Sequence, residues 1–219
     1  MNTDQAIKER RTFKVIAPEP WPPSQSEAEL KATIHTLLKA AGCAPFRYAC
    51  DEQHQQGTAL KGKVPRRFHV LDTATTRKVA HYFKTRSNGS GTLLGMLYAA
   101  DATILTTWLP DPMPAGTDPE WLFYPSRRNM DHIAGAAAAV QNLLLAATDL
   151  GLETTWSSGG HLQTLEYFDL LGIPKREILL GALFIFPRDI KNADVAMGDL
   201  RPHRGEPSDW SRFVTMQAT

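Results

Sequence analysis

The stretch that most constrains this chain runs over residues 134–156 and is apolar on nearly every face of the helix that it predicts. A helix that is hydrophobic all round belongs inside a protein rather than on its surface. Over residues 132–150 it would span roughly 28 Å at ~1.5 Å per residue, about the width of a small domain. Gly151 breaks this helix, and a strand-like segment at 153–157 then leads to the glycine pair 159–160. The stretch therefore predicts a central buried helix that delivers a strand and two glycines to a defined place.

Composition excludes several classes of function. The 219 residues carry 24 basic and 23 acidic side chains, a net charge of +1, which argues against nucleic acid or an anionic membrane as the main partner. Cys43 and Cys50 form neither a CxxC pair nor a zinc spacing, and the histidines show no metal-ligand spacing, so we expect a reduced, cytoplasmic protein without a metal. No apolar run reaches the ~20 residues that span a bilayer, and no signal core is visible at the N-terminus.

Helices and strands alternate along the sequence, which predicts a single α/β or α+β domain over residues 1–219. Residues 46–62 are polar and irregular and are expected to form a loop or insertion, and residues 188–219 a C-terminal arm. We expect a first short helix, capped by Thr3 and Asp4, that runs through Ile7 to Arg10. Further helices are expected at 26–42, 75–84, 93–100, 120–127, 132–150 and 162–171, and strands at 67–72, 102–108, 153–157 and 178–187.

Two basic clusters are candidate phosphate sites. Arg10, Arg11, Thr12 and Lys14 place three cations and a hydroxyl just past a short helix, and guanidinium groups bind phosphate with two parallel hydrogen bonds. The alternative is a solvated basic helix end, which the helix dipole also favours. The segment 201–204 holds a second cluster in a region too polar to be core, and both clusters could close on one phosphate.

The glycine pair is a candidate for contact with a planar ligand. Gly159 and Gly160 follow a predicted strand, and their backbone N–H groups could approach such a ligand closely. An ordinary strand-to-helix turn is the alternative. Residues 89–95 imitate a dinucleotide-binding fingerprint, but with one residue too many and after a helix instead of a strand, so we reject that motif.

In order and spacing these pieces resemble the flavin-dependent nitroreductase family over most of residues 4–187. The resemblance rests on AIKERRTFK (6–14), AGCAP (41–45), PRRFHVL (65–71), VQNLLLAATDLGLETTW (140–156) and LGIP (171–174). It implies an α+β nitroreductase-like fold: a mostly antiparallel sheet flanked by helices, with a long buried central helix. It also implies an intertwined homodimer that binds FMN at its interface.

The same resemblance assigns roles to single residues. Arg10, Arg11 and Thr12 match the motif for the FMN phosphate and ribityl chain, and Lys14 matches a lysine near the flavin pyrimidine edge. Gly159 and Gly160 match the segment whose N–H groups face the flavin N5, and Arg204, with Arg201 as a weaker candidate, matches an arginine that returns to the phosphate.

Other positions depart from the family pattern. Pro65 is retained from an Asn-x-Gln-Pro-Trp segment, but Arg66 stands at the tryptophan position and the asparagine has no clear counterpart. The resemblance also implies that residues 44–45 and 65–67 reach the flavin of the partner subunit. After the last strand, IlePhePro (185–187) replaces Gly-Tyr-Pro.

We expect an FMN-dependent oxidoreductase that transfers hydride from NAD(P)H through the flavin to a nitroaromatic, a quinone or a related small acceptor, with no catalytic side chain required. Trp121, Phe123 and Tyr124 could form an aromatic lid, although core packing is the commoner role of such residues. The alternatives are a specialised flavin reaction, such as reductive dehalogenation or flavin breakdown, and a non-catalytic flavin-binding or structural homodimer.

Overall fold

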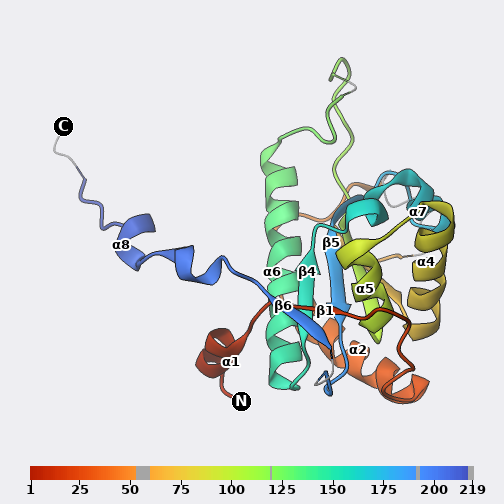
Figure 1. The fold of residues 1–219 in the computed structure, drawn as a ribbon. Coiled ribbons are helices and arrows are strands. Elements are labelled where there is room, and N and C mark those ends of the chain that lie inside the picture. Colours follow the sequence, from red (N-terminus) through yellow and green to blue (C-terminus); the bar gives the residue numbers. More distant parts are fainter. Residues whose placement is uncertain (53–59, 119, 191–192, 217–219) are drawn as a thin grey trace.

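A four-stranded antiparallel sheet in the order β2-β3-β5-β4 forms the centre of the molecule (Figure 1). The computed structural model describes residues 1–52, 60–118, 120–190 and 193–216. Every side chain of β3 is buried, as its β-branched and apolar sequence predicted. The strands are β2 (Arg66–Leu71), β3 (Ala102–Trp108), β4 (Thr154–Ser157) and β5 (Ile178–Ile185).

Helices cover both faces of this sheet and form two cores. Neighbouring strand residues point to opposite faces, so Ile104 packs in the core under α2 and α6, whereas Leu105 packs in the core under α4, α5 and α7. The first core contains Leu143 of α6, and the second contains Phe83 of α4. The helices are α2 (Glu27–Gly42), α4 (Thr73–Arg86), α5 (Gly91–Ala99), α6 (Arg127–Asp149) and α7 (Leu165–Leu171).

The predicted central helix is confirmed as α6, which has 23 residues. It begins five residues before the expected start, because the Ser126 hydroxyl caps it by accepting a hydrogen bond from the Asn129 N–H at 3.1 Å. One side of α6 is buried against the sheet. On the other side Ala134 is exposed and Ile133 and Ala137 are only partly covered, so an apolar surface remains open in the single chain.

Local signals fixed some element boundaries and not others. The capping box of Ser26 and Glu29 and the end of α2 at Gly42 are confirmed. The expected helix at 162–171 is split into a 3₁₀ turn, η1 (Gly160–Gln163), and α7, because Thr164 adopts an extended backbone. The short helix expected at 120–127 is wrong: the described residues 120–126 are irregular, and they belong to a loop, 110–126, that projects from the body (Figure 1).

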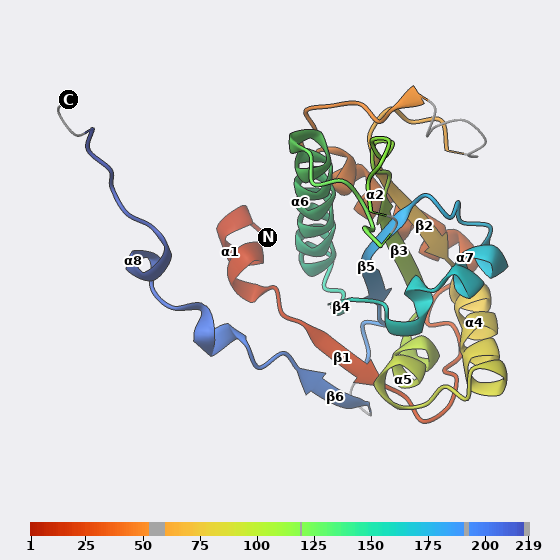
Figure 2. The same cartoon turned by 90° about the horizontal axis from the view of Figure 1, so that it is seen from above.

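The two ends of the chain meet in a separate two-stranded sheet. β1 (Phe13–Ile16) follows α1 (Thr3–Glu9) and pairs antiparallel with β6 (Asp194–Met197). After β6 the chain forms η2 (Arg201–Arg204) and α8 (Pro207–Trp210) and leads away from the body (Figures 1 and 2). Of the expected insertion at 46–62, residues 53–59 lie outside the described residues, as do 191–192 and 217–219 of the expected arm.

None of the helices in the described ranges is long and apolar enough to cross a membrane. Among the same residues, no three His, Cys, Asp or Glu side chains come together as a ligand set for a metal ion.

Candidate functional site

A small pocket of about 230 Å³ lies where the beginning and the end of the chain meet; we call it the arginine pocket. The pairing of β1 with β6 builds it, and the N–H of Gly198 continues that pairing by donating to the Thr12 carbonyl at 3.2 Å. The structure thus brings together residues that the sequence offered as two separate clusters. The lining consists of Arg10, Arg11, Thr12, Lys14, Gly198, Asp199, Leu200, Arg201 and Arg204.

Two of the arginines are held by the end of α1. Nη1 of Arg201 donates to the Arg10 carbonyl at 3.2 Å and Nη2 to the Lys8 carbonyl at 2.9 Å. Arg11 donates through Nη1 to the same two carbonyls. A helix leaves its last carbonyls without partners, and cations there are also favoured by the helix dipole. Arg11 and Arg201 are therefore fixed in place, while the side chains of Arg10 and Arg204 donate to no other described residue.

The electrostatics of this pocket favour an anion. Burial lowers the pKa of Arg10 below its ordinary value, and the neighbouring charges of Arg204, Arg201 and Arg11 lower that pKa further. In the described part of the chain no carboxylate lies within ion-pair distance of these four arginines, although Asp199 is part of the lining. Four converging guanidinium groups that form no ion pair with a described carboxylate fit a phosphate, whose oxygens accept from several donors at once.

The predicted glycine pair forms a turn that suits glycine. Gly159 has φ +93° and Gly160 φ +53°, in the left-handed region where other residues are strained. A Cβ on Gly159 would lie 2.6 Å from Cδ2 of Leu179, and one on Gly160 would lie 3.5 Å from Cδ2 of Leu93. The backbone between β4 and η1 is thus closely packed and free of side chains at both positions.

β1 connects this turn to the arginine pocket. The Thr155 hydroxyl of β4 donates to the Phe13 carbonyl at the start of β1. On the other side α5 packs against β1, and the Ala17 N–H donates to the Gly95 carbonyl at 3.1 Å. Lys14 is exposed on β1, opposite Ala196 of β6, and lines the arginine pocket. The arginine pocket, the lysine and the glycine turn are therefore carried by one continuous set of packed elements.

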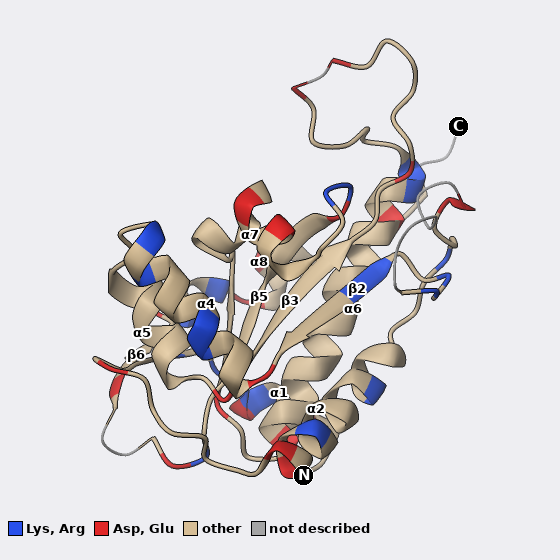
Figure 3. Ribbon diagram, turned by 90° about the vertical axis from the view of Figure 1, so that its right-hand side faces the viewer, with Lys and Arg blue, Asp and Glu red and all other residues tan. Residues whose placement is uncertain are grey.

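Pro65 and Arg66 do not line the arginine pocket. They stand at the start of β2, where the chain carries a basic pair (Figure 3). Arg66 is only 7% exposed, and its Nη2 donates to the carbonyls of Gly42 and Ala44, each at 3.1 Å. Its Nη1 is buried without a hydrogen-bond partner, and burial lowers the pKa of this guanidinium. Arg66 therefore ties the end of α2 to the sheet.

The three aromatic residues expected as a lid lie in the projecting loop. Trp121 stacks on Tyr124 with ring centroids 6.2 Å apart, and Phe123 meets Trp108 edge-on at 5.1 Å. Sequence reasoning missed the residue that closes this loop at its base. Asn129, 1% exposed, accepts from the N–H of Asp111 and donates to the carbonyl of Tyr124, each at 2.8 Å, which joins the two ends of the loop.

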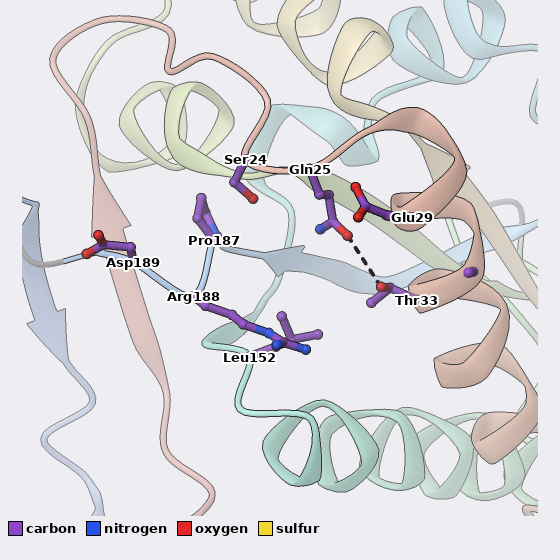
Figure 4. Close-up of a pocket in the computed structure, with 9 residues that line it drawn as sticks. Ser24, Gln25, Glu29, Thr33, Leu152, Pro187, Arg188 and Asp189 are labelled. Carbon is purple, nitrogen blue, oxygen red and sulfur yellow. Dashed lines mark hydrogen bonds between the residues drawn. The ribbon is translucent and has the colours of Figure 1, made fainter.

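A larger cavity of about 590 Å³, shown in Figure 4, lies between the start of α2 and the end of β5. Most of its polar side chains already have partners in the chain. Glu29 belongs to the capping box of α2, and Thr33 donates to Gln25 at 3.4 Å. Ser24 donates to the buried carboxylate of Asp101 through both its N–H and its hydroxyl. Size alone does not make this cavity a candidate site.

The antiparallel sheet, the long helix on one of its faces and the arginine pocket built by both chain ends describe an α+β protein with a candidate site for an anion. The model of the nitroreductase family matches residues 7–185, so the chain belongs to the nitroreductase family, a family of oxidoreductases. No curated protein sequence matches the chain.

Solved structures agree on the fold. A nitroreductase-like family protein from Bacillus cereus is 18% identical, with a TM-score of 0.64, over 98% of this chain and 96% of the other. The nitroreductase CinD from Lactococcus lactis, in complex with nicotinic acid, is 17% identical with a TM-score of 0.62, over 99% and 100%. A putative nitroreductase from Desulfovibrio desulfuricans, in complex with FMN, is 20% identical with a TM-score of 0.57, over 99% of each chain.

Proposed function

We propose that this protein is an FMN-dependent oxidoreductase that transfers hydride from NAD(P)H to a nitroaromatic, a quinone or a related small acceptor. The observation that carries the proposal is the arginine pocket, in which four guanidinium groups converge and form no ion pair with a carboxylate of the described residues. Family membership supports FMN as the molecule whose phosphate occupies this pocket, since proteins of this fold have been solved with FMN.

Different residues of the site would contact different parts of the cofactor. Arg10 and Arg204, whose side chains donate to no other described residue, would bind the FMN phosphate. The positive charges of Arg11 and Arg201 would help to neutralise the negative charge of that phosphate. The hydroxyl of Thr12 adds a donor for the phosphate or the ribityl chain. The chemistry that FMN supplies when bound is hydride transfer, which no side chain of the pocket can perform.

Lys14 and the glycine turn would act on the ring system. An exposed cation on β1 favours negative charge on the pyrimidine edge of a reduced flavin. Gly159 and Gly160 would let backbone N–H groups approach the ring without interference from a side chain. In this arrangement the protein binds, orients and stabilises charge, and no acid or base is needed.

NAD(P)H is expected to bind transiently, as a substrate rather than as a resident cofactor. The described strands of both sheets pair only in antiparallel fashion, so they contain no parallel βαβ unit of the type that binds a dinucleotide permanently. The nicotinamide would therefore have to reach the flavin directly and leave before the acceptor enters.

A homodimer is the expected assembly. Trp210 is 70% exposed, and Phe213 and Met216 are almost fully exposed, on an arm that leaves the body (Figure 2). The outward side of α6 is also apolar and partly open, and large exposed apolar areas mark interaction surfaces. In such a dimer, residues 44–45 and 65–67 would approach the partner's flavin, and the unpartnered Nη1 of Arg66 would be available there.

The visible spectrum of the purified protein tests this proposal. We expect a yellow protein, or a colourless one that binds added FMN with a spectral shift and a higher melting temperature. Anaerobic NADH or NADPH should then bleach the flavin, and a nitroaromatic or a quinone should restore its colour. A protein that neither contains nor binds FMN contradicts the proposal. If the protein binds FMN but neither nucleotide bleaches it, the protein binds flavin without the proposed NAD(P)H-dependent activity. Sedimentation equilibrium tests the homodimer, and a monomer at micromolar concentration would overturn that part.

A further inference from the structure

A second cavity, of about 490 Å³, lies between the loop 110–126 and α7 and shares no residue with the arginine pocket. Leu122 and Phe123 of the loop line one side, and Phe168 of α7 and Leu179 of β5 line the other. Most of the lining side chains are apolar. A cavity of this size with an apolar lining and a few polar groups is typical of small-molecule sites.

Glu177 supplies an unusual polar group to this cavity. The residue directly precedes β5, is only 3% exposed and belongs to the lining. Its Oε2 interacts with Nε2 of His69 at 2.6 Å and accepts a hydrogen bond from the hydroxyl of Thr107. Both interactions fall on the same oxygen. Within the described residues, no donor is bonded to Oε1.

A buried carboxylate with one unused oxygen is poised to accept from a ligand. Removing a carboxylate from water is unfavourable unless protein groups or a ligand replace the lost hydrogen bonds, and each oxygen can accept more than one. Two other charged groups of the lining are already engaged: Lys175 pairs with Asp169 at 2.9 Å, and Asp111 pairs with Arg128 at 2.6 Å. Oε1 of Glu177 is thus an acceptor that the chain itself leaves available.

We propose that this cavity binds a planar aromatic molecule that carries an N–H donor, such as an aromatic carboxamide, and that Oε1 of Glu177 accepts from that donor. The aromatic and aliphatic walls would hold the ring. The carboxylate, kept in orientation by His69 and Thr107, would select for the donor. A ring with the same shape but no donor would leave the buried oxygen unpaired, and binding would weaken accordingly.

The cavity also adjoins the glycine turn. Leu179 lines the cavity, and its Cδ2 is the atom that a Cβ on Gly159 would meet at 2.6 Å. A bound ligand would therefore lie within one side chain of that turn. The proposal does not depend on FMN, because none of the residues that carry it belongs to the arginine pocket.

Calorimetric titration of the full-length protein with benzamide and with N,N-dimethylbenzamide tests the assignment, in the presence and absence of FMN. We expect benzamide to bind about tenfold more tightly, the weakening expected when a buried acceptor loses its donor. Glu177→Met removes the acceptor at similar volume and should abolish the difference, while Glu177→Gln keeps an uncharged oxygen and should reduce it. Glu19→Gln, the matched change at an exposed carboxylate, should leave it intact.

Equal affinity of the native protein for the two compounds would overturn the proposal, as would a folded Glu177→Met protein that still prefers benzamide. If the methionine variant fails to fold, which circular dichroism detects, the native protein and Glu177→Gln decide the question. The FMN spectrum is recorded on the same samples. A protein that binds no flavin but prefers benzamide through Glu177 would contradict the proposed function and uphold this inference.

Discussion

Replacing Arg10 by alanine should change the protein in opposite directions with and without its cofactor. The Arg10 side chain donates to no other described residue, so its removal breaks no hydrogen bond within the described part of the chain. With FMN bound, the loss of one charge-assisted hydrogen bond of about 1.5–3 kcal/mol weakens binding roughly 10- to 150-fold. Without FMN, removing Arg10 relieves its repulsion with Arg204, Arg201 and Arg11, which adds to the effect of burial in lowering the pKa of Arg10.

The gain without the cofactor is small, because the charges of the pocket are partly exposed and water screens them. We expect about 0.5 kcal/mol of added stability, which corresponds to a rise of about 1–2 °C in melting temperature for a chain of this length. Fluorescence quenching of FMN measures the dissociation constant, and calorimetry with and without FMN measures both melting temperatures. Arg86→Ala, which removes an exposed cation at the end of α4, is the matched control and should change neither.

If Arg10→Ala binds FMN as tightly as the control Arg86→Ala does, the reasoning is refuted and the FMN phosphate binds elsewhere. Loss of stability in the protein without FMN would show that Arg10 has an internal partner and that the pocket is not short of negative charge.

Three further outcomes follow from the fold. Gly159→Ala should lower stability by about 1–2 kcal/mol in chemical denaturation, since alanine is strained at φ +93°, whereas Gly42→Ala, which meets no atom within 4 Å, should be tolerated; equal effects would contradict this. Asn129→Leu should cost about 2–3 kcal/mol and speed proteolysis in the projecting loop, because both loop ends lose a buried hydrogen bond; an intact loop would argue against the clamp. Burial lowers the pKa of His132 below 6.5, so His132 takes up a proton at higher pH in the unfolded chain than in the folded one. The free energy of unfolding should therefore fall as pH drops below about 6.5, by at most ~1.4 kcal/mol per pH unit. His132→Asn should flatten this pH dependence, and an unchanged profile would mean that other groups cause it.

Sequence reasoning succeeded where the signal is local. The capping box at Ser26, the end of a helix at Gly42 and the β-branched, apolar run that marks β3 all depend on residues within one turn or one strand. The arginine cluster and the glycine pair were also visible, because unusual residue types stand close together in the sequence. The family resemblance then linked them to one cofactor.

The missed features depend on contacts between distant segments. β6 has a short and largely exposed sequence, and only its pairing with β1 makes it a strand. The sequence predicts Arg66 as a site residue, yet its Nη2 donates hydrogen bonds to two carbonyls at and just after the end of α2. Glu177 stands in the charged run LysArgGlu, which predicts an exposed loop, and it is buried only because His69 and Thr107 of two other strands surround it.

The arginine pocket joins residues 191 positions apart, as the hydrogen bond from Arg201 to the Arg10 carbonyl records. During synthesis, the first half of the site leaves the ribosome long before the second half exists, so a phosphate cannot be held there until almost the whole chain has emerged. Once both halves are present, a phosphate bound there would act as a non-covalent cross-link across most of the polypeptide, and closing so long a loop would remove much of the unfolded chain's freedom. Clipping the last few dozen residues would then release the ligand and loosen the beginning of the chain at the same time.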